Sequence, residues 1–172
     1  MMRAALEVLA GDYESAERVV RPSVAILLEA GEKAYYSSCL GYLAEAVYGQ
    51  GRYDEAEQLA LEAGEAGGAD DVETQRLSLG VRAKVLARKG ESAEAERLVR
   101  HVIELLEPTD TLTGKAEALL DLAKVLELTG RRDEAVAAVR EAAELYAAKG
   151  AKAGVRAAEA RAAELEAESS SP

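Results

Sequence analysis

The sequence has no Trp, Phe or Asn, and it has only one Cys, one His and three Pro among its 172 residues. A lone Cys cannot form an internal disulfide, and a lone His cannot supply the paired histidines of an H-E-x-x-H zinc site. Without Phe or Trp, a core must be built from Leu, Val and Ala. Ala has the highest helix propensity and lets helix axes approach closely, so this composition favours packed α-helices.

Long apolar runs and an excess of basic residues are also missing. No apolar run approaches the roughly 18 residues of a membrane span, and Met1–Gly11 lacks the basic and then apolar pattern of a signal peptide. The net charge of −11 disfavours nucleic acids and anionic membrane surfaces as partners. Together with the single Cys, these features predict a cytoplasmic protein.

Catalytic constellations are not evident. His101 lies off the apolar stripe of its predicted helix and is expected on the surface, and Cys39 is expected to be a structural thiol on an apolar helix. Thr113-Gly114-Lys115-Ala116 is not a phosphate-binding loop, because Ala116 replaces the Ser or Thr that would hold magnesium. We therefore expect no enzyme activity, no metal and no cofactor.

The sequence does contain an internal repeat. Four similar segments begin at Gly11, Gly51, Gly90 and Gly130, at intervals of 40, 39 and 40 residues. Each segment reads as a turn between two helices, because Gly can adopt the left-handed conformation that ends a helix. Acidic residues follow in the first turn of the next helix, where the helix dipole favours negative charge.

Apolar residues recur at helical spacing on both sides of each turn. The helix after the turn begins its stripe with a small residue five positions after the Gly: Ala16, Ala56, Ala95 and Ala135. The helix before the turn has a stripe of its own, which in the second repeat is Leu40, Leu43, Ala44 and Val47. Offsets of three, four and seven place such residues on one helix face, so each repeat is predicted to be an α-hairpin.

These stripes resemble the tetratricopeptide repeat. Leu40-x2-Leu43-Ala44-x2-Val47, followed by Gly51, Tyr53, Ala56 and Ala60, matches its pattern of large, small and aromatic positions. The resemblance covers about residues 1–148. It departs from the family in its longer period of about 40 residues, in the Leu, Val or Ala at Trp and Phe positions, and in the missing repeat-ending Pro. It implies an all-α, right-handed superhelix (an α-solenoid) of about four helix hairpins with a C-terminal capping helix.

A narrower resemblance comes from residues 82–88 and 118–126. They are similar to the C-terminal repeat region of multidomain bacterial proteins that carry a nucleotide-cyclase domain and an ATPase domain upstream. This resemblance implies a regulatory fragment of a larger bacterial signalling protein, with no cyclase or ATPase chemistry in this chain.

We expect one repeat domain over residues 1–168 and a disordered tail over 169–172. The first helix has only ten residues before Gly11, where its equivalents have near eighteen. This predicts either a fragment of a longer protein or an N-terminal edge covered by another subunit. The last helix presents Val155, Ala158, Ala162 and Leu165 on one face and is expected to cap the stack. The expected helices span 1–10, 12–30, 32–50, 53–67, 72–89, 92–107, 112–129, 132–148 and 151–168.

The family resemblance also implies a binding surface. Its repeats form a concave groove lined by the first helix of each hairpin, and the groove holds a protein or peptide partner. Transferred to this chain, the groove residues are Ser38, Tyr42, Glu45, Tyr48, Leu77, Lys84, Arg88, Glu117, Leu120, Lys124 and Glu127. Further groove positions are Gly41, Gly49, Gly80, Ala87 and Leu128. The leading hypothesis is a non-catalytic interaction or scaffold module. The alternative is a self-association element that forms a homodimer through its open N-terminal edge.

The helix over residues 74–90 is basic in an otherwise acidic chain, since it contains no Asp or Glu. In one interpretation its cations pair with acidic residues of neighbouring helices. In the other, Lys84, Arg88 and Lys124 hold a carboxylate or an acidic peptide. Chaperone-binding tetratricopeptide domains use such a clamp with Asn residues, and this sequence has no Asn.

Overall fold

A computed structural model describes residues 2–68 and 70–169, and these form nine α-helices and no strand. Every helix boundary lies within one residue of the bound expected from the sequence. The expected tail overlaps the last helix at Ser169, and its residues 170–172 lie outside the described part of the chain. The helices are α1 (Met2–Leu9), α2 (Tyr13–Ala30), α3 (Lys33–Gly49), α4 (Tyr53–Ala66), α5 (Val72–Arg88), α6 (Ser92–Leu106), α7 (Leu112–Leu128), α8 (Arg132–Lys149) and α9 (Lys152–Ser169).

The glycines at the repeat interval make the turns, as predicted. Gly11, Gly51, Gly90 and Gly130 have φ values of 76°, 81°, 85° and 80°, in the left-handed region that favours glycine. Side chains cap the helices that follow some of the turns: Asp12 accepts a hydrogen bond from the Ser15 amide at 3.1 Å at the start of α2.

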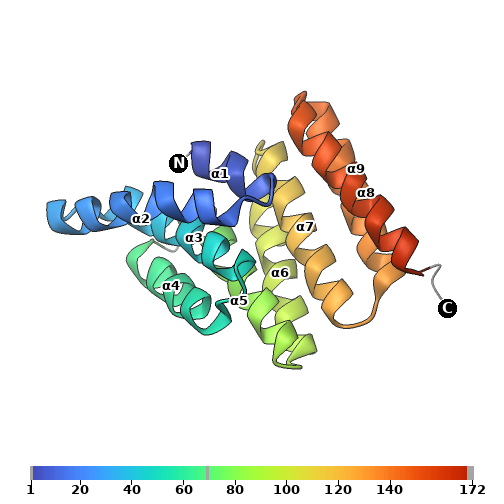
Figure 1. The fold of residues 1–172 in the computed structure, drawn as a ribbon, viewed down its shortest axis with the longest axis horizontal. Coiled ribbons are helices and arrows are strands. Elements are labelled where there is room, and N and C mark those ends of the chain that lie inside the picture. Colours follow the sequence, from blue (N-terminus) through green and yellow to red (C-terminus); the bar gives the residue numbers. More distant parts are fainter. Residues whose placement is uncertain (1, 69, 170–172) are drawn as a thin grey trace. The chain divides into compact units, whose positions relative to one another are not determined.

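The helices group into two compact units, Met1–Val85 and Leu86–Pro172, with the boundary inside α5. In the first unit, α1 packs on α2, α2 on α3, and α3 on α4 (Figure 1). Its core is built from small and branched side chains, among them Ala16, Ala56, Leu43 and Val47, each at most 1% exposed. Small residues at the helix contacts allow the close packing that the composition predicts.

In the second unit, α6, α7, α8 and α9 pack on one another in chain order. Ala135, Val139 and Ala142 of α8 are buried, as are Ala158 and Leu165 of α9. The opposite face of α9 is exposed and rich in Lys, Arg, Glu and Ala, as expected of a capping helix.

The chain therefore has the all-α helical-repeat solenoid fold that the glycine spacing and the apolar stripes predict. The single repeat domain expected over residues 1–168 stays a prediction. Among the described helices, none combines the length and the apolar character that a bilayer crossing requires.

Candidate functional site

In the first unit, the predicted binding surface corresponds to one half-exposed side of α3. Ser38, Tyr42 and Glu45 lie one turn apart on this side, and each is partly exposed. The Tyr42 hydroxyl donates a hydrogen bond to Glu73 of α5 at 3.0 Å, and the Ser38 hydroxyl lies 3.3 Å from that of Thr74. Tyr42 is thus held in place by α5 while part of its surface remains open to a partner.

Leu77 does not line a groove, in contrast to the prediction. It is 1% exposed, because its side chain fills the space left by the missing side chain of Gly41. A Cβ atom built on Gly41 would lie 2.7 Å from the Cβ of Leu77. Gly41, Gly80 and Ala87 are also buried, so within α5 only Arg88 of the predicted positions is exposed.

Tyr48 and Lys84 are buried as well, being 8% and 6% exposed. Lys84 Nζ donates to both carboxylate oxygens of Glu45 at 2.7 and 2.8 Å, and it lies 5.2 Å from the centre of the Tyr48 ring. The Tyr48 ring also contacts that of Tyr53, with ring centres 5.2 Å apart. For Lys84, pairing with a neighbouring helix is therefore confirmed, and an anion grip through this residue is wrong.

In the second unit, the predicted residues of α7 form a half-exposed stripe. Glu117, Leu120, Lys124 and Glu127 follow one another at spacings of three or four residues, and each is partly exposed. Leu120 is the apolar member of this set. A partly exposed Leu flanked by charged side chains offers a contact point for an apolar side chain with polar groups around it.

Glu127 is the anionic centre of the α7 stripe. Lys124 donates to it at 2.9 Å, and Arg161 of α9 also donates to it. Burial acts to raise the pKa of Glu127, but the hydrogen bonds from the two cations outweigh burial, and the pKa is lowered. Glu127 is therefore ionised at neutral pH, and Lys124 already has a carboxylate partner.

The structure also contains two matching ion-pair clusters that sequence reasoning missed. Arg52 donates to Glu17 at 2.8 Å in the first unit, and Arg131 donates to Glu96 at 2.5 Å in the second. Each pair joins the residue after a turn Gly to a Glu 35 positions earlier. The signal was present in the sequence, as an Arg directly after Gly51 and Gly130 and a Glu six residues after Gly11 and Gly90.

A shallow hollow of about 610 Å³ lies beside the first of these clusters. Its walls come from one side of α2 and the end of α3. Two of its charged residues are engaged with each other, since Arg21 donates to Glu17 at 2.5 Å. Gln50 also donates to Glu17, at 2.6 Å. The lining residues are Glu14, Glu17, Arg18, Arg21, Pro22, Ala25 and Gln50.

The side chains with catalytic or metal-binding potential are dispersed. Within residues 2–68 and 70–169, no three His, Cys, Asp or Glu side chains are grouped so that they could hold a metal ion. Cys39 is buried, and this burial raises the pKa of its thiol and keeps it protonated. His101 is exposed, as expected.

Comparison with known structures supports the fold. Two crystal structures from Podosopora anserina, described as kinesin light chain with nearly identical TPR-like repeats, superpose with a TM-score of 0.56 each. One of them carries a point substitution. Sequence identities are 18% and 17%, with 98% and 99% of this chain and 93% and 95% of the other chains covered. No curated protein matches the sequence significantly.

Family models match the sequence itself in two places. One tetratricopeptide repeat model matches residues 74–148, and a second matches residues 37–63. Together these segments make up more than half of the chain, and they include the stripes of α3 and α7 described above. With its helical hairpins, its turn glycines and these two matches, the chain belongs to the tetratricopeptide repeat superfamily.

Proposed function

We propose that the chain is a non-catalytic module that binds a segment of another protein along the half-exposed sides of its first helices. Tetratricopeptide repeats generally mediate protein–protein interactions or scaffolding. In this chain the corresponding surfaces are the α3 stripe of Ser38, Tyr42 and Glu45, and the α7 stripe that contains Leu120.

The observation that carries the proposal is the position of Leu120. It is partly exposed, as are Leu112 and Leu128 at the two ends of α7, whereas Leu119, Leu122 and Leu126 are at most 7% exposed. Burying an apolar side chain of this size contributes roughly 1.5–3 kcal/mol, so Leu120 gives the middle of α7 an apolar contact point. The segment we propose carries an apolar residue for Leu120 and polar groups for Glu117 and Lys124.

A peptide selection would test this proposal. Peptides selected against the intact chain from a random phage-displayed library are expected to lose affinity roughly tenfold or more for Leu120→Glu. Leu61→Glu is the matched control, because Leu61 is an exposed Leu on α4, 41% exposed, and belongs to neither stripe. Selected peptides that bind wild type, Leu120→Glu and Tyr42→Ala equally would contradict the proposed surface.

We further propose that this module is a regulatory arm of a larger bacterial signalling protein in the cytoplasm. The support is the resemblance of residues 82–88 and 118–126 to the repeat regions of such proteins, and a single Cys without a disulfide partner. The full reading frame of the gene tests this idea. An upstream cyclase or ATPase module would support it, and a frame with no signalling domain would overturn it.

A further inference from the structure

The hollow on the outer side of α2 contains two charged side chains that the ion-pair cluster does not use. Arg21 and Glu17 are paired with each other, whereas Glu14 and Arg18 are exposed. Among the described residues, Arg18 donates only to the hydroxyl of Ser15, at 2.6 Å, and neither Glu14 nor Arg18 takes part in an ion pair. One anion and one cation of the hollow are therefore open to a ligand.

The exposure of this side of α2 follows from its place in the repeat. The residues on it are exposed, and so are those that occupy the same places in α4, which follows another hairpin. The residues are Glu14, Arg18, Pro22 and Ala25 in α2, and Asp54, Gln58, Glu62 and Glu65 in α4. The α4 set contains acids and no cation, so a ligand that needs an arginine distinguishes α2 from α4.

Pro22 adds a hydrogen-bond acceptor to the same side of α2. It lies in the interior of the helix and has no backbone N–H, so the carbonyl of Arg18 loses the helical hydrogen bond that it would otherwise accept. A helical carbonyl points towards the residue four positions on, and both Arg18 and Pro22 line the hollow. A backbone N–H of a bound segment can donate to this carbonyl.

The spacing of the lining residues matches that of an extended chain. Glu14, Arg18 and Pro22 follow one another in steps of four residues, which are about 6 Å along a helix. Side chains on one face of an extended segment are about 6.6 Å apart, because every second residue points the same way. Three alternate side chains of such a segment can therefore lie opposite these three residues.

We infer that the hollow binds an extended segment of a partner protein in which a basic, an acidic and an apolar residue occupy alternate positions. The basic side chain pairs with Glu14 and the acidic one with Arg18. The apolar side chain covers Pro22 and Ala25. The volume of about 610 Å³ lies within the range of roughly 300–1,000 Å³ that is usual for binding pockets. The hollow shares no residue with the α3 and α7 stripes, so neither proposal depends on the other.

Two labelled peptides test this inference. The first, Thr-Lys-Thr-Glu-Thr-Leu-Thr, has the proposed pattern, and its β-branched Thr residues favour an extended chain. The second, Thr-Lys-Thr-Lys-Thr-Leu-Thr, carries a basic residue in place of the acidic one. Fluorescence anisotropy measures the binding of each peptide to the intact protein, at protein concentrations up to about 1 mM. Wild type is expected to bind the first peptide at least about fivefold more tightly than the second.

Reversing the charge of Arg18 should reverse this preference. Arg18→Glu is expected to weaken binding of the first peptide at least about fivefold and to strengthen binding of the second, because opposite charges then face each other again. Arg97→Glu is the matched control, since Arg97 has the place of Arg18 in α6, is exposed and pairs with Glu94. It should leave both affinities within about twofold of wild type.

Pro22→Ala tests the contact to the backbone. This substitution restores the N–H that the Arg18 carbonyl accepts from within the helix, and it is expected to weaken binding of both peptides about threefold.

The inference is overturned if wild type binds neither peptide or binds both equally. It is likewise overturned if Arg18→Glu and Arg97→Glu bind the first peptide alike, or if Pro22→Ala binds both peptides as tightly as wild type. Binding of the second peptide by Arg18→Glu also shows that this variant is folded. A wild-type dimer in light scattering that Arg18→Glu converts to a monomer would overturn the inference too, because a second copy then occupies the hollow.

Discussion

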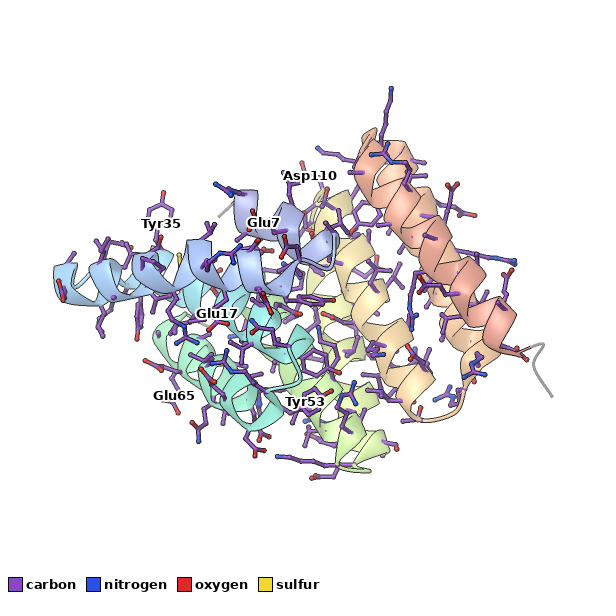
Figure 2. All side chains as sticks on the ribbon, viewed as in Figure 1. Glu7, Glu17, Tyr35, Tyr53, Glu65 and Asp110 are labelled. Atoms are coloured by element: carbon purple, nitrogen blue, oxygen red, sulfur yellow. The ribbon has the colours of Figure 1, made fainter. Side chains whose placement is uncertain are left out.

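Glu17 of α2 and Arg52, the residue before α4, form an ion pair at 2.8 Å that links the first hairpin to the second. Arg21 and Gln50 donate to the same carboxylate, and Glu55 accepts from both arginines. Figure 2 labels Glu17 among the side chains of the first unit. Its side chain is 16% exposed, so the cluster is shielded from solvent more than a typical surface pair.

Glu17 should make the stability of the protein depend on pH in acid. Burial alone would raise its pKa, but hydrogen bonds from Gln50, Arg21 and Arg52 lower it to about 2. The unfolded carboxyl titrates at about 4.3, so the stabilisation is complete above that pH and is lost as the pH falls towards about 2. Thermal unfolding of Glu17→Gln should therefore change less over this range than that of wild type. Glu14→Gln, an exposed change in the same helix, should follow wild type.

The buried pair of Lys84 and Glu45 predicts a strong effect of removing one partner. Lys84→Met leaves the Glu45 carboxylate, 12% exposed, without its main cation, and should lower the free energy of unfolding by about 3–5 kcal/mol. The double variant Glu45→Gln/Lys84→Met should recover part of this loss, because neither charge remains. Urea denaturation measures both effects. If Lys84→Met were as stable as wild type, the ion pair of Lys84 and Glu45 would not contribute to stability as proposed.

The helices could be predicted closely because their limits are encoded locally. Each turn has a Gly at a nearly constant interval, and each following helix begins its apolar stripe with a small Ala. The residues of the α3 and α7 stripes, by contrast, came from the resemblance to the tetratricopeptide repeat and not from this spacing. The pairing of the two helices in a hairpin likewise depends on residues that are close in sequence, such as Val47 and Ala56 on either side of Gly51.

The binding surface of α5 could not be predicted in the same way. Leu77 is buried because Gly41, in another helix, leaves space for it, and Lys84 is buried because Glu45 neutralises it. Glu45 and Lys84 are 39 residues apart, and they occupy the same position in successive repeats. Spacing within one helix assigns a residue to a face, but only the neighbouring repeat decides whether that face is open.

Gly49 predicts an energetic coupling with Tyr13. A Cβ atom on Gly49 would overlap ring carbons of Tyr13, so Gly49→Ala should destabilise the protein by about 1–3 kcal/mol. In a Tyr13→Ala background the ring is gone, and the same substitution should cost much less. A double-mutant cycle by chemical denaturation measures the difference, and we expect a coupling of about 1–2 kcal/mol.

Gly31→Ala serves as the comparison for this cycle. Gly31 has a φ of 67° and no atom within 4 Å of a built Cβ, so its cost should come from the backbone conformation alone. That cost should be the same with and without Tyr13. Equal costs for Gly49→Ala in both backgrounds would show that the ring does not pack on this glycine.

The small residues at the start of each second helix predict where the hairpins cannot accept a larger side chain. Ala56, Ala95 and Ala135 are each fully buried, at 0% exposed. Ala56→Leu and Ala135→Leu should each lower the free energy of unfolding by about 1–3 kcal/mol, because the added methyl groups force neighbouring helices apart. Ala163→Leu, an exposed change on the outer side of α9, should stay within about 0.5 kcal/mol of wild type. If Ala56→Leu and Ala135→Leu changed the free energy of unfolding as little as Ala163→Leu, the helices of each hairpin would not be in close contact at Ala56 and Ala135.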